Sequence, residues 1–334
     1  MTLNVINLAH DGRERALARG TIVADRELSL TADAVLFEGN GRLGISHLDL
    51  VEPGEQDVVV DVIWSGVSTG TEKLLWSGDM PPFPGLSYPL VPGYEAVGTV
   101  VSGPAGLIGQ HVFVPGSKGF RGAAGLFGAS ASRLVCAADK LVPINLSDPS
   151  QGVLLALAAT AYHAVDQDNL PELIVGHGVV GRLLARIVIA LGGEPTVWEI
   201  NPDRLDSSEY RVCHPDEDTR RDYKAICDVS GDPNIIDQLL GRLAPQGEIV
   251  LAGFYAERPS FAFPMAFMRE MRLRVAAEWS AGDLGAVVAL IDQGQLGLDG
   301  LITHTFAAAE ADAAYRTAFT DPRCLKLILN WRAA

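Results

Sequence analysis

The sequence predicts an α/β protein with two domains, a β-rich domain followed by a doubly wound parallel sheet. Three observations lead to this fold class. The chain has 334 residues, which is long enough for two hydrophobic cores. Short apolar runs separated by Gly and Pro fill residues 34–142, as expected for short strands. From residue 151, apolar strands alternate with segments of helix length, the pattern of βαβ units.

Residues 1–31 are mixed and charged, and we interpret them as an N-terminal extension without recognisable chemistry. Residues 32–150 form the predicted β-rich domain. Its strands are expected in the segments AVLFEG, LGISHLDL, DVVVDVIWSG, AVGTVVSG, HVFVPG and SRLVCA. The segment LSYPLVPGYE inside this domain is too rich in proline for a central strand.

Residues 151–282 form the predicted second domain. It opens with GVLLALAATAYHAV, a helix that is apolar all round and is therefore expected to be buried. The strands ELIVG, PTVWEI, AICDVSG and EIVLAGFY then alternate with the helices RLLARIVIALGG and NIIDQLLGRLAPQG. Residues 283–334 have the pattern helix, strand, helix, strand, and we expect them to return to the first domain.

Composition narrows the function. The chain is 48% hydrophobic with a net charge of −15, which indicates a globular protein and argues against nucleic acid or an anionic membrane as partner. Its four cysteines, Cys136, Cys213, Cys227 and Cys324, have neither zinc-ribbon spacing nor the density of a disulfide framework. Without a secretory signal pattern or a long apolar run, we expect a cytoplasmic protein with no integral membrane segment.

A G-x-G-x-x-G motif at Gly176, Gly178 and Gly181 predicts a dinucleotide site. An apolar strand leads into the first glycine and a helix begins at the last, so the helix N-terminus faces the phosphates. The residues of this turn that we expect to bind the cofactor are Gly176, His177, Gly178, Val179, Val180 and Gly181.

The next strand ends at Glu199, 18 residues beyond Gly181. An acid at this place accepts hydrogen bonds from the adenosine ribose and repels a 2′-phosphate, which favours NAD over NADP. The nearest following cation, Arg204, is five positions away. Residues at the later strand ends, Ser230, Gly253 and Phe254, are expected to line the crevice for the nicotinamide.

From about Ala34 to Trp331 the chain resembles the medium-chain dehydrogenase/reductase superfamily, which combines a GroES-like catalytic domain with a Rossmann domain. Zinc-dependent members bind the metal through a G-[IV]-C segment, a G-H-E segment and a later Cys or Asp. Here those segments read GVSTGTE, GYE and LLALAATAY, with Ser68 or Thr69, Tyr94 and a position near Ala156 in place of the ligands. We therefore expect no catalytic zinc.

Longer segments resemble the bacteriochlorophyllide dehydrogenase family within this superfamily. They are STGTEKLLWSGDMPPFPGLSYPLVPGYE, LLALAATAYHA, LIVGHGVVGRLLAR, GEIVLAGFY, FPMAFMRE and DGLITH. The resemblance implies oxidation of the 3-(1-hydroxyethyl) group of a bacteriochlorophyllide to 3-acetyl, with NAD as acceptor. It supplies the substrate class, which nothing in charge or periodicity identifies.

Without zinc to acidify the alcohol, a side chain has to accept its proton. Tyr94 is the first candidate, with Glu95 orienting it. His163, Tyr162 and Thr71 fall near the same cleft by resemblance, as do Thr160 and Glu72. Tyr94 as an aromatic that only fills the former metal cavity, His163 as a helix residue bonded to backbone, and Glu95 as a structural carboxylate stay open as alternatives.

Ser68, Thr69, Lys118 and Arg121 are candidate substrate-binding residues. The two cations lie in a small-residue loop at 115–132, where they are suited to pair with a propionate, although a solvated loop explains them equally well.

Two rival functions stay open: a zinc-free quinone or enoyl reductase using NADPH, and a non-catalytic dinucleotide-binding protein. The oligomeric state stays open, and the superfamily resemblance implies a homo-oligomer. Arg269, Arg272 and Arg274 are assigned to a strand edge or subunit contact.

Overall fold

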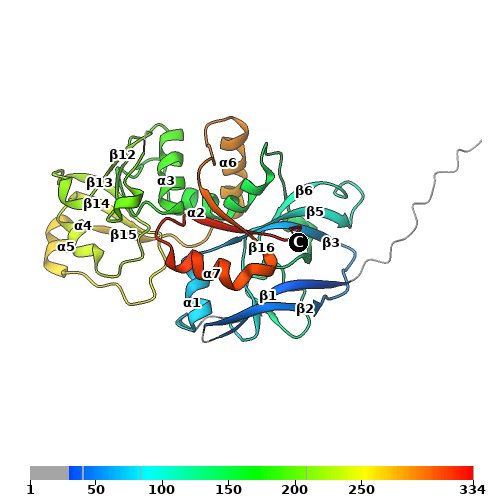
Figure 1. Ribbon diagram of the computed structural model, residues 1–334. Helices are drawn as coiled ribbons and strands as arrows, with labels where there is room; N and C mark the ends of the chain where they lie inside the picture. The colour runs from blue at the N-terminus through cyan, green and yellow to red at the C-terminus, as the bar shows by residue number, and fades with distance from the viewer. Residues whose placement is uncertain (1–29, 40, 83, 208, 334) are drawn as a thin grey trace, which may run out of the picture.

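A computed structural model describes residues 30–39, 41–82, 84–207 and 209–333. The predicted N-terminal extension lies outside these residues except for its last two positions. Figure 1 shows two lobes, one built mainly from the first half of the chain and one from the middle. The C-terminal helix and strands lie between them.

The first lobe contains two sheets, and its strands confirm the predicted β-rich domain. A four-stranded sheet has the order β2 (Arg42–Asp49), β1 (Thr31–Gly39), β4 (Leu90–Val91), β7 (Ala124–Gly125). A seven-stranded sheet has the order β16 (Ile302–Ala307), β17 (Lys326–Asn330), β3 (Asp57–Val67), β5 (Ala96–Ser102), β6 (His111–Val114), β9 (Val142–Pro143), with β8 (Arg133–Ala137) also paired to β3. Strands from both ends of the chain therefore share one sheet.

The second lobe is a six-stranded parallel sheet, which confirms the doubly wound fold. Its order is β12 (Arg211–Cys213), β11 (Thr196–Trp198), β10 (Leu173–Val175), β13 (Tyr223–Asp228), β14 (Leu243–Leu251), β15 (Arg272–Val275). The order reverses between β11, β10 and β13, and ligands of open α/β sheets bind at such a reversal.

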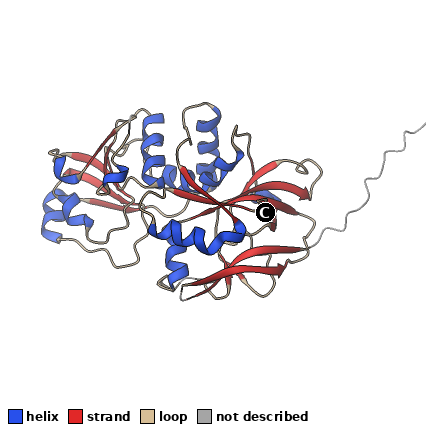
Figure 2. Ribbon diagram, in the orientation of Figure 1, coloured by secondary structure: helices blue, strands red, loops and turns tan. Residues whose placement is uncertain are grey.

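Seven α-helices are assigned in the described residues, and Figure 2 shows those of the second lobe around its sheet. They are α1 (Thr71–Ser77), α2 (Leu155–His163), α3 (Val179–Ala190), α4 (Ile235–Leu240), α5 (Phe263–Arg269), α6 (Ala281–Asp292) and α7 (Ala311–Thr320). Short 3-10 turns lie at Ala138–Lys140, Pro149–Leu154, Pro202–Arg204, Pro215–Glu217 and Ala308–Glu310. None of the helices in the described residues is long and apolar enough to cross a bilayer.

Helix α2 joins the two lobes, which explains why it is apolar all round. Residues 153–159 of this segment are at most 7% exposed. Residues 153–158 belong to a single core cluster that includes Val97 and Phe113 of the first lobe and Ile174 and Val250 of the second. Helix α6 spans the predicted domain boundary at residue 282 and packs on α2, so the chain re-enters the first lobe at β16.

The predicted helix NIIDQLLGRLAPQG is wrong in its second half. Helix α4 ends at Leu240, and β14 begins at Leu243, which pairs with Tyr223. Pro245 lacks the N–H that a helix interior needs, and Gln246 adopts a positive φ of 61°, so the helix cannot continue. Helices α1 and α5 were not predicted, because each has only seven residues.

Candidate active site and cofactor site

The glycine turn has the backbone geometry that its motif predicts. Gly176 follows β10 with φ of 102°, a conformation that favours glycine. A Cβ on Gly181 would lie 1.9 Å from the carbonyl oxygen of Gly176, so only glycine lets α3 approach the turn this closely. Gly178 is the N-cap of α3, which places the free N–H groups of Val179 and Val180 at the turn.

Glu199 binds the glycine turn to the end of β11. It is 8% exposed, and its carboxylate accepts hydrogen bonds from the backbone N–H groups of His177 at 2.9 Å and of Ile200 and Asn201 at 2.8 Å each. A carboxylate has roughly four acceptor positions, so about one remains for a ligand hydroxyl.

Arg204 lies beside the same turn but is bound to the first lobe. Its Nε donates to the carbonyl of Pro322 at 2.8 Å, and its Nη2 donates to that of Cys324 at 3.0 Å. Asn201 also donates to Pro322, at 3.2 Å. The remaining nitrogen, Nη1, lies 3.8 Å from where a Cβ on Gly178 would be. The guanidinium thus joins the cofactor lobe to the segment before β17.

Both ring nitrogens of His177 form hydrogen bonds within the protein. It is fully buried, with Nδ1 2.5 Å from the carbonyl of Arg204 and Nε2 2.9 Å from the hydroxyl of Tyr210. Burial lowers the pKa of His177, which favours a neutral ring that donates from Nδ1 and accepts at Nε2. Its backbone N–H donates to Glu199, and its backbone carbonyl accepts from Nε of Arg182 at 3.3 Å, so the backbone of His177 is also bonded within the protein.

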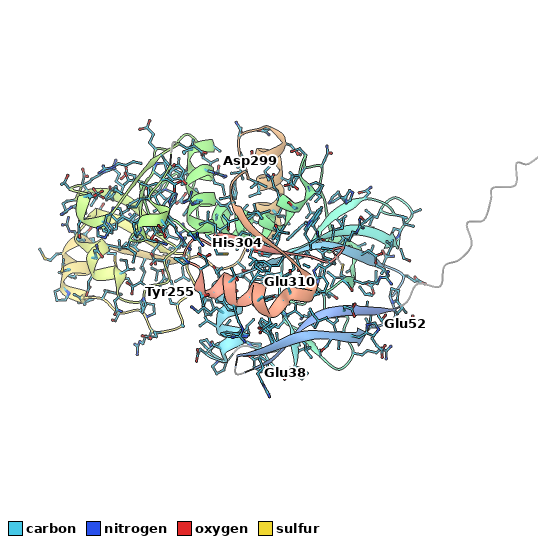
Figure 3. All side chains as sticks on the ribbon, in the orientation of Figure 1. Glu38, Glu52, Tyr255, Asp299, His304 and Glu310 are labelled. Atoms are coloured by element: carbon cyan, nitrogen blue, oxygen red, sulfur yellow. The ribbon has the colours of Figure 1, made fainter. Side chains whose placement is uncertain are left out.

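The ends of β13 and β14 are tied together by Asp228, a fully buried residue that the sequence reasoning did not single out. It accepts bonds from the N–H and hydroxyl of Ser230 at 3.1 and 2.7 Å, and from the hydroxyl of Tyr255. Gly253 packs against Gly231, where a Cβ would approach the Gly231 nitrogen to 2.9 Å, and Phe254 is 46% exposed. Figure 3 shows the labelled Tyr255 on the side of the second lobe that faces the first.

Three hydroxyl groups meet in the first lobe, and we call Tyr94, Ser68 and Thr71 the hydroxyl cluster. The Tyr94 hydroxyl donates to Oγ of Ser68 at 2.8 Å, and Oγ of Ser68 lies 3.2 Å from Oγ1 of Thr71. The Tyr94 ring packs edge-on against Phe127, with centroids 5.6 Å apart. Burial, followed by the charge of Glu95, raises the pKa of Tyr94, so the phenol stays neutral and acts as a donor.

Glu95 does not bind Tyr94. Its carboxylate accepts two bonds from Nζ of Lys326 at 2.7 and 2.9 Å, and both residues are at most 1% exposed. Lys326 also donates to the carbonyl of Val67 at 3.2 Å. Gly66 makes room for this pair, because a Cβ there would lie 2.0 Å from the Glu95 carboxylate. Burial raises the pKa of Glu95, and the Lys326 ammonium opposes that shift.

The side chains at the C-terminal end of α2 form hydrogen bonds with partners outside the hydroxyl cluster. Nδ1 of His163 is 2.8 Å from the carboxylate of Asp283 in α6, and the Tyr162 hydroxyl accepts from Gln167 at 2.7 Å. Thr160 donates to the carbonyl of Ala156 at 3.0 Å. None of these hydrogen bonds joins the side chain of His163 or of Tyr162 to Tyr94.

The small-residue loop at 115–132 is largely packed. Phe120 is 6% exposed and Ala129 and Ser130 are fully buried, whereas Lys118 and Arg121 are exposed. Arg121 donates to the carbonyl of Leu50 at 3.2 Å. Thr69 is half-buried beside Ser68.

The residues at the former zinc positions do not fit zinc. Ser68, Thr69, Tyr94 and Ala156 offer neither thiolate, imidazole nor carboxylate, and Glu95 is bound to Lys326. In the part of the chain that the structure describes, no three His, Cys, Asp or Glu side chains gather as a metal site.

Sequence reasoning missed Lys326 and Tyr315, which contact Glu95 and Glu72, and it considered Asp228 and Tyr255 only as parts of the strand ends that line the crevice. A signal existed only for Lys326, which is the one charged residue in the otherwise apolar segment CLKLILNW. A lysine inside a buried strand requires a partner carboxylate, but the sequence does not say which one.

Known proteins match this architecture. Residues 54–146 match the alcohol dehydrogenase GroES-like domain. The chain is 54% identical to 2-desacetyl-2-hydroxyethyl bacteriochlorophyllide A dehydrogenase of Rhodobacter capsulatus, over 91% of this chain and 100% of that protein. The protein of the same name from Cereibacter sphaeroides is also 54% identical, over 90% and 98%. An Escherichia coli short chain alcohol dehydrogenase, solved with NADH, superimposes with a TM-score of 0.77 at 18% identity, covering 90% of this chain and 100% of that one.

Proposed function

The chain belongs to the bacteriochlorophyllide dehydrogenase family of the medium-chain dehydrogenase/reductase superfamily, and we propose that it oxidises a 3-(1-hydroxyethyl) bacteriochlorophyllide to the 3-acetyl pigment with NAD, without zinc. The chemistry of the site supports this reaction. The observation that carries it is the hydroxyl cluster, a chain of proton-transferring groups at the place where zinc-dependent relatives hold their metal.

In the proposed reaction, the C–H bond of the hydroxyethyl carbon breaks with its electron pair and the O–H bond loses a proton as the carbonyl forms. The nicotinamide ring supplies the hydride acceptor when it is bound. Tyr94 takes the substrate proton on its oxygen as its own proton moves to Ser68. Ser68 in turn passes a proton to Thr71, which is half-buried and able to release it to water.

In this scheme Tyr94 relays a proton as a neutral phenol and does not act as a phenolate base that is present before the reaction. Its raised pKa makes a standing phenolate unfavourable, so proton loss and gain at its oxygen must be concerted. Glu95 contributes indirectly, because its pair with Lys326 fixes the segment before β5 that carries Tyr94. His163 and Tyr162, with partners elsewhere, have no part in this relay.

NAD is proposed as the cofactor because of Glu199 and Arg204. The Glu199 carboxylate is held at the end of β11 with acceptor capacity for a ribose hydroxyl, and its negative charge disfavours a 2′-phosphate. Arg204, the nearby cation that a 2′-phosphate would need, donates instead to Pro322 and Cys324. Backbone N–H groups at Val179 and Val180 are suited to the pyrophosphate.

Two expectations about the surroundings of the enzyme are part of the proposal. Lys118, exposed on the loop beside the first sheet, is the candidate partner for a propionate of the pigment. The four cysteines are free and buried, which supports a reducing compartment such as the cytoplasm.

We also propose that the chain forms a homodimer through β15 and α5. Seven of the thirteen exposed large hydrophobic residues in the described part of the chain lie between 261 and 275, among them Phe267 at 67% and Val275 at 73% exposure. Strand β15 is the edge of the parallel sheet, so its outer backbone groups are free to pair with a second copy. A group of exposed apolar side chains of this kind is unfavourable in a monomer.

The experiment mixes purified protein with 3-hydroxyethyl bacteriochlorophyllide and either NAD or NADP and follows the long-wavelength pigment band. Conversion of the alcohol to an acetyl group extends conjugation, so turnover shifts the band to the red. We expect the shift with NAD, and we expect it to survive a strong chelator. Loss of the red shift with the chelator would contradict the proposal that the site works without zinc. Absence of the shift with both cofactors would contradict the proposed substrate.

A further inference from the structure

A buried carboxylate behind the hydroxyl cluster has no part in the relay described above. Glu72 lies in the first turn of α1 and is 1% exposed. A carboxylate that is removed from water in this way requires hydrogen-bond partners or a function that justifies its cost.

Both oxygens of Glu72 are engaged. Oε1 accepts from the backbone N–H of Ser68 at 3.0 Å, and Oε2 accepts from the hydroxyl of Tyr315 in α7 at 2.7 Å. Ser68 is the central member of the hydroxyl cluster, so Glu72 binds the backbone of the residue whose side chain receives the Tyr94 proton. Helix α7 reaches this point from the C-terminal end of the chain.

Tyr315 has an alternative partner. Oγ of Ser130 lies 3.4 Å from its hydroxyl oxygen, and Ser130 packs against Gly93, the residue before Tyr94. An ionised Glu72 accepts from both Ser68 and Tyr315. A protonated Glu72 has one acceptor site fewer and becomes a donor, so the Tyr315 oxygen can accept a hydrogen bond from it and donate to Ser130 instead.

The titratable groups that face Glu72 come from three other elements. They are Tyr315 in α7, Glu95 and Tyr94 in the segment before β5, and Lys326 in β17. Burial raises the pKa of Glu72 to about 7, while the Ser68 and Tyr315 bonds lower it. Glu72 is therefore able to change its charge near neutral pH.

The geometry points to Glu72 as a positioning residue of the hydroxyl cluster, whose ionised carboxylate holds Ser68 in line with Tyr94 while Tyr315 orients that carboxylate. This inference rests on the proposed oxidation. When Glu72 gains a proton, the charge-assisted bond to the Ser68 N–H becomes a weaker neutral bond. The Ser68 hydroxyl then loses its fixed position, and proton transfer from Tyr94 slows.

The first test measures kcat and KM against pH for the wild type, Glu72→Gln and Tyr315→Phe with NAD and the hydroxyethyl pigment. We expect wild-type kcat to rise through about pH 7. In Glu72→Gln, kcat is expected to fall about 10- to 100-fold and this rise to disappear, with KM unchanged. Tyr315→Phe keeps the carboxylate but removes a bond that stabilises its charge, so the rise moves to higher pH.

Tyr223→Phe is the matched control. Tyr223 is also a buried tyrosine that donates to a carboxylate, Asp218 at 2.8 Å, but it lies in β13 of the other lobe. Its removal is expected to leave the pH profile of kcat as it is in the wild type. Bound NADH, followed by its fluorescence, shows that each variant retains a folded cofactor lobe.

A second readout does not require turnover. Infrared difference spectra over the same pH range detect the carbonyl stretch of a buried protonated carboxylic acid. We expect a band that titrates near neutral pH in the wild type, that is lost in Glu72→Gln and that titrates at higher pH in Tyr315→Phe.

The outcomes separate the inference from the proposed function. An unchanged kcat and pH profile in Glu72→Gln overturns the positioning role. If Glu72→Gln does not fold, Tyr315→Phe decides: an upward shift of the profile supports the role, and a wild-type profile overturns it. If the wild type turns over no pigment, the proposed function fails, and the infrared titration alone supports or overturns the Glu72–Tyr315 switch.

Discussion

In the proposed reaction, Tyr94 takes the place that the metal occupies in zinc-dependent relatives. Its hydroxyl is neutral, buried and already directed at Ser68. Tyr94→Phe removes only the oxygen that relays the proton. We expect kcat to fall about 10²- to 10⁴-fold with NADH affinity unchanged, measured by pigment turnover and NADH fluorescence. Tyr88→Phe, which removes a hydroxyl bonded to the Leu75 carbonyl, is the control, and equal losses in both variants would contradict the relay.

The buried pair of Glu95 and Lys326 leads to a stability prediction. Lys326→Met leaves the Glu95 carboxylate buried and unpaired, and we expect the free energy of unfolding to fall by about 3–5 kcal/mol in urea titrations. The double variant Glu95→Gln with Lys326→Met removes the uncompensated charge and should recover much of that loss. If Lys326→Met alone lowers the free energy of unfolding by less than about 1 kcal/mol, the pair does not stabilise this region.

Glu72 also makes stability depend on pH. Its pKa rises from 4.5 to about 7 on folding, so between these values the folded chain binds more protons at this site than the unfolded chain. The free energy of unfolding at this site therefore falls as pH rises from 4.5 to 7. Glu72→Gln is expected to flatten this part of the pH dependence in urea titrations. The raised pKa of Glu95 makes the free energy of unfolding depend on pH in the same direction, so the Glu72→Gln variant keeps part of the slope. A slope identical to that of the wild type would contradict the prediction.

At this scale, local motifs identify the candidate residues of the site but do not identify their distant partners. The glycines, Glu199, Tyr94, Ser68 and Thr71 follow from local motifs, because each acts through its own turn or strand end. Lys326 and Tyr315 reach the site from more than 200 residues away. No local pattern specifies which buried carboxylate a distant lysine or tyrosine will meet, so Glu95 was assigned to its neighbour Tyr94 instead.

At the scale of elements, the end of β11 and the glycine turn act as one unit through Glu199. Glu199→Gln removes the charge and weakens acceptance from the ribose and the turn. We expect NADH to bind about 10- to 100-fold more weakly, and the preference for NAD over NADP in kcat/KM to fall. Glu194→Gln, at an exposed position in the same lobe, is the control. An unchanged cofactor preference would remove Glu199 from the specificity site.

Strands and long helices were predictable because their apolar period continues over many residues. The six predicted strands of the first lobe and the βαβ units of the second are all present. The error at residues 241–247 has a local cause: Leu243 and Leu239 fit a helical spacing, whereas Pro245 and the left-handed Gln246 favour the start of β14. Helices of seven residues, such as α1, carry too few turns for their pattern to stand out.

For the whole molecule, the apolar edge at β15 and α5 predicts a two-fold dimer. Val275→Asp places a charge in that edge, and we expect it to convert the dimer to a monomer in light scattering coupled to size exclusion. Ile108→Asp changes an exposed apolar residue of the first lobe, at 53% exposure, and serves as the control. A wild-type chain that is monomeric at micromolar concentration would contradict the prediction.

The central claim concerns the two lobes together: a hydride passes from the hydroxyethyl carbon of the pigment to the nicotinamide of an NAD whose pyrophosphate is bound at the glycine turn. The most direct measurement uses a pigment with deuterium on that carbon and determines by mass spectrometry where the label goes. We predict one deuterium in the reduced NAD and none in water, with chelator present throughout. Acetyl pigment formed without label in the cofactor, or label released to water, would contradict the account.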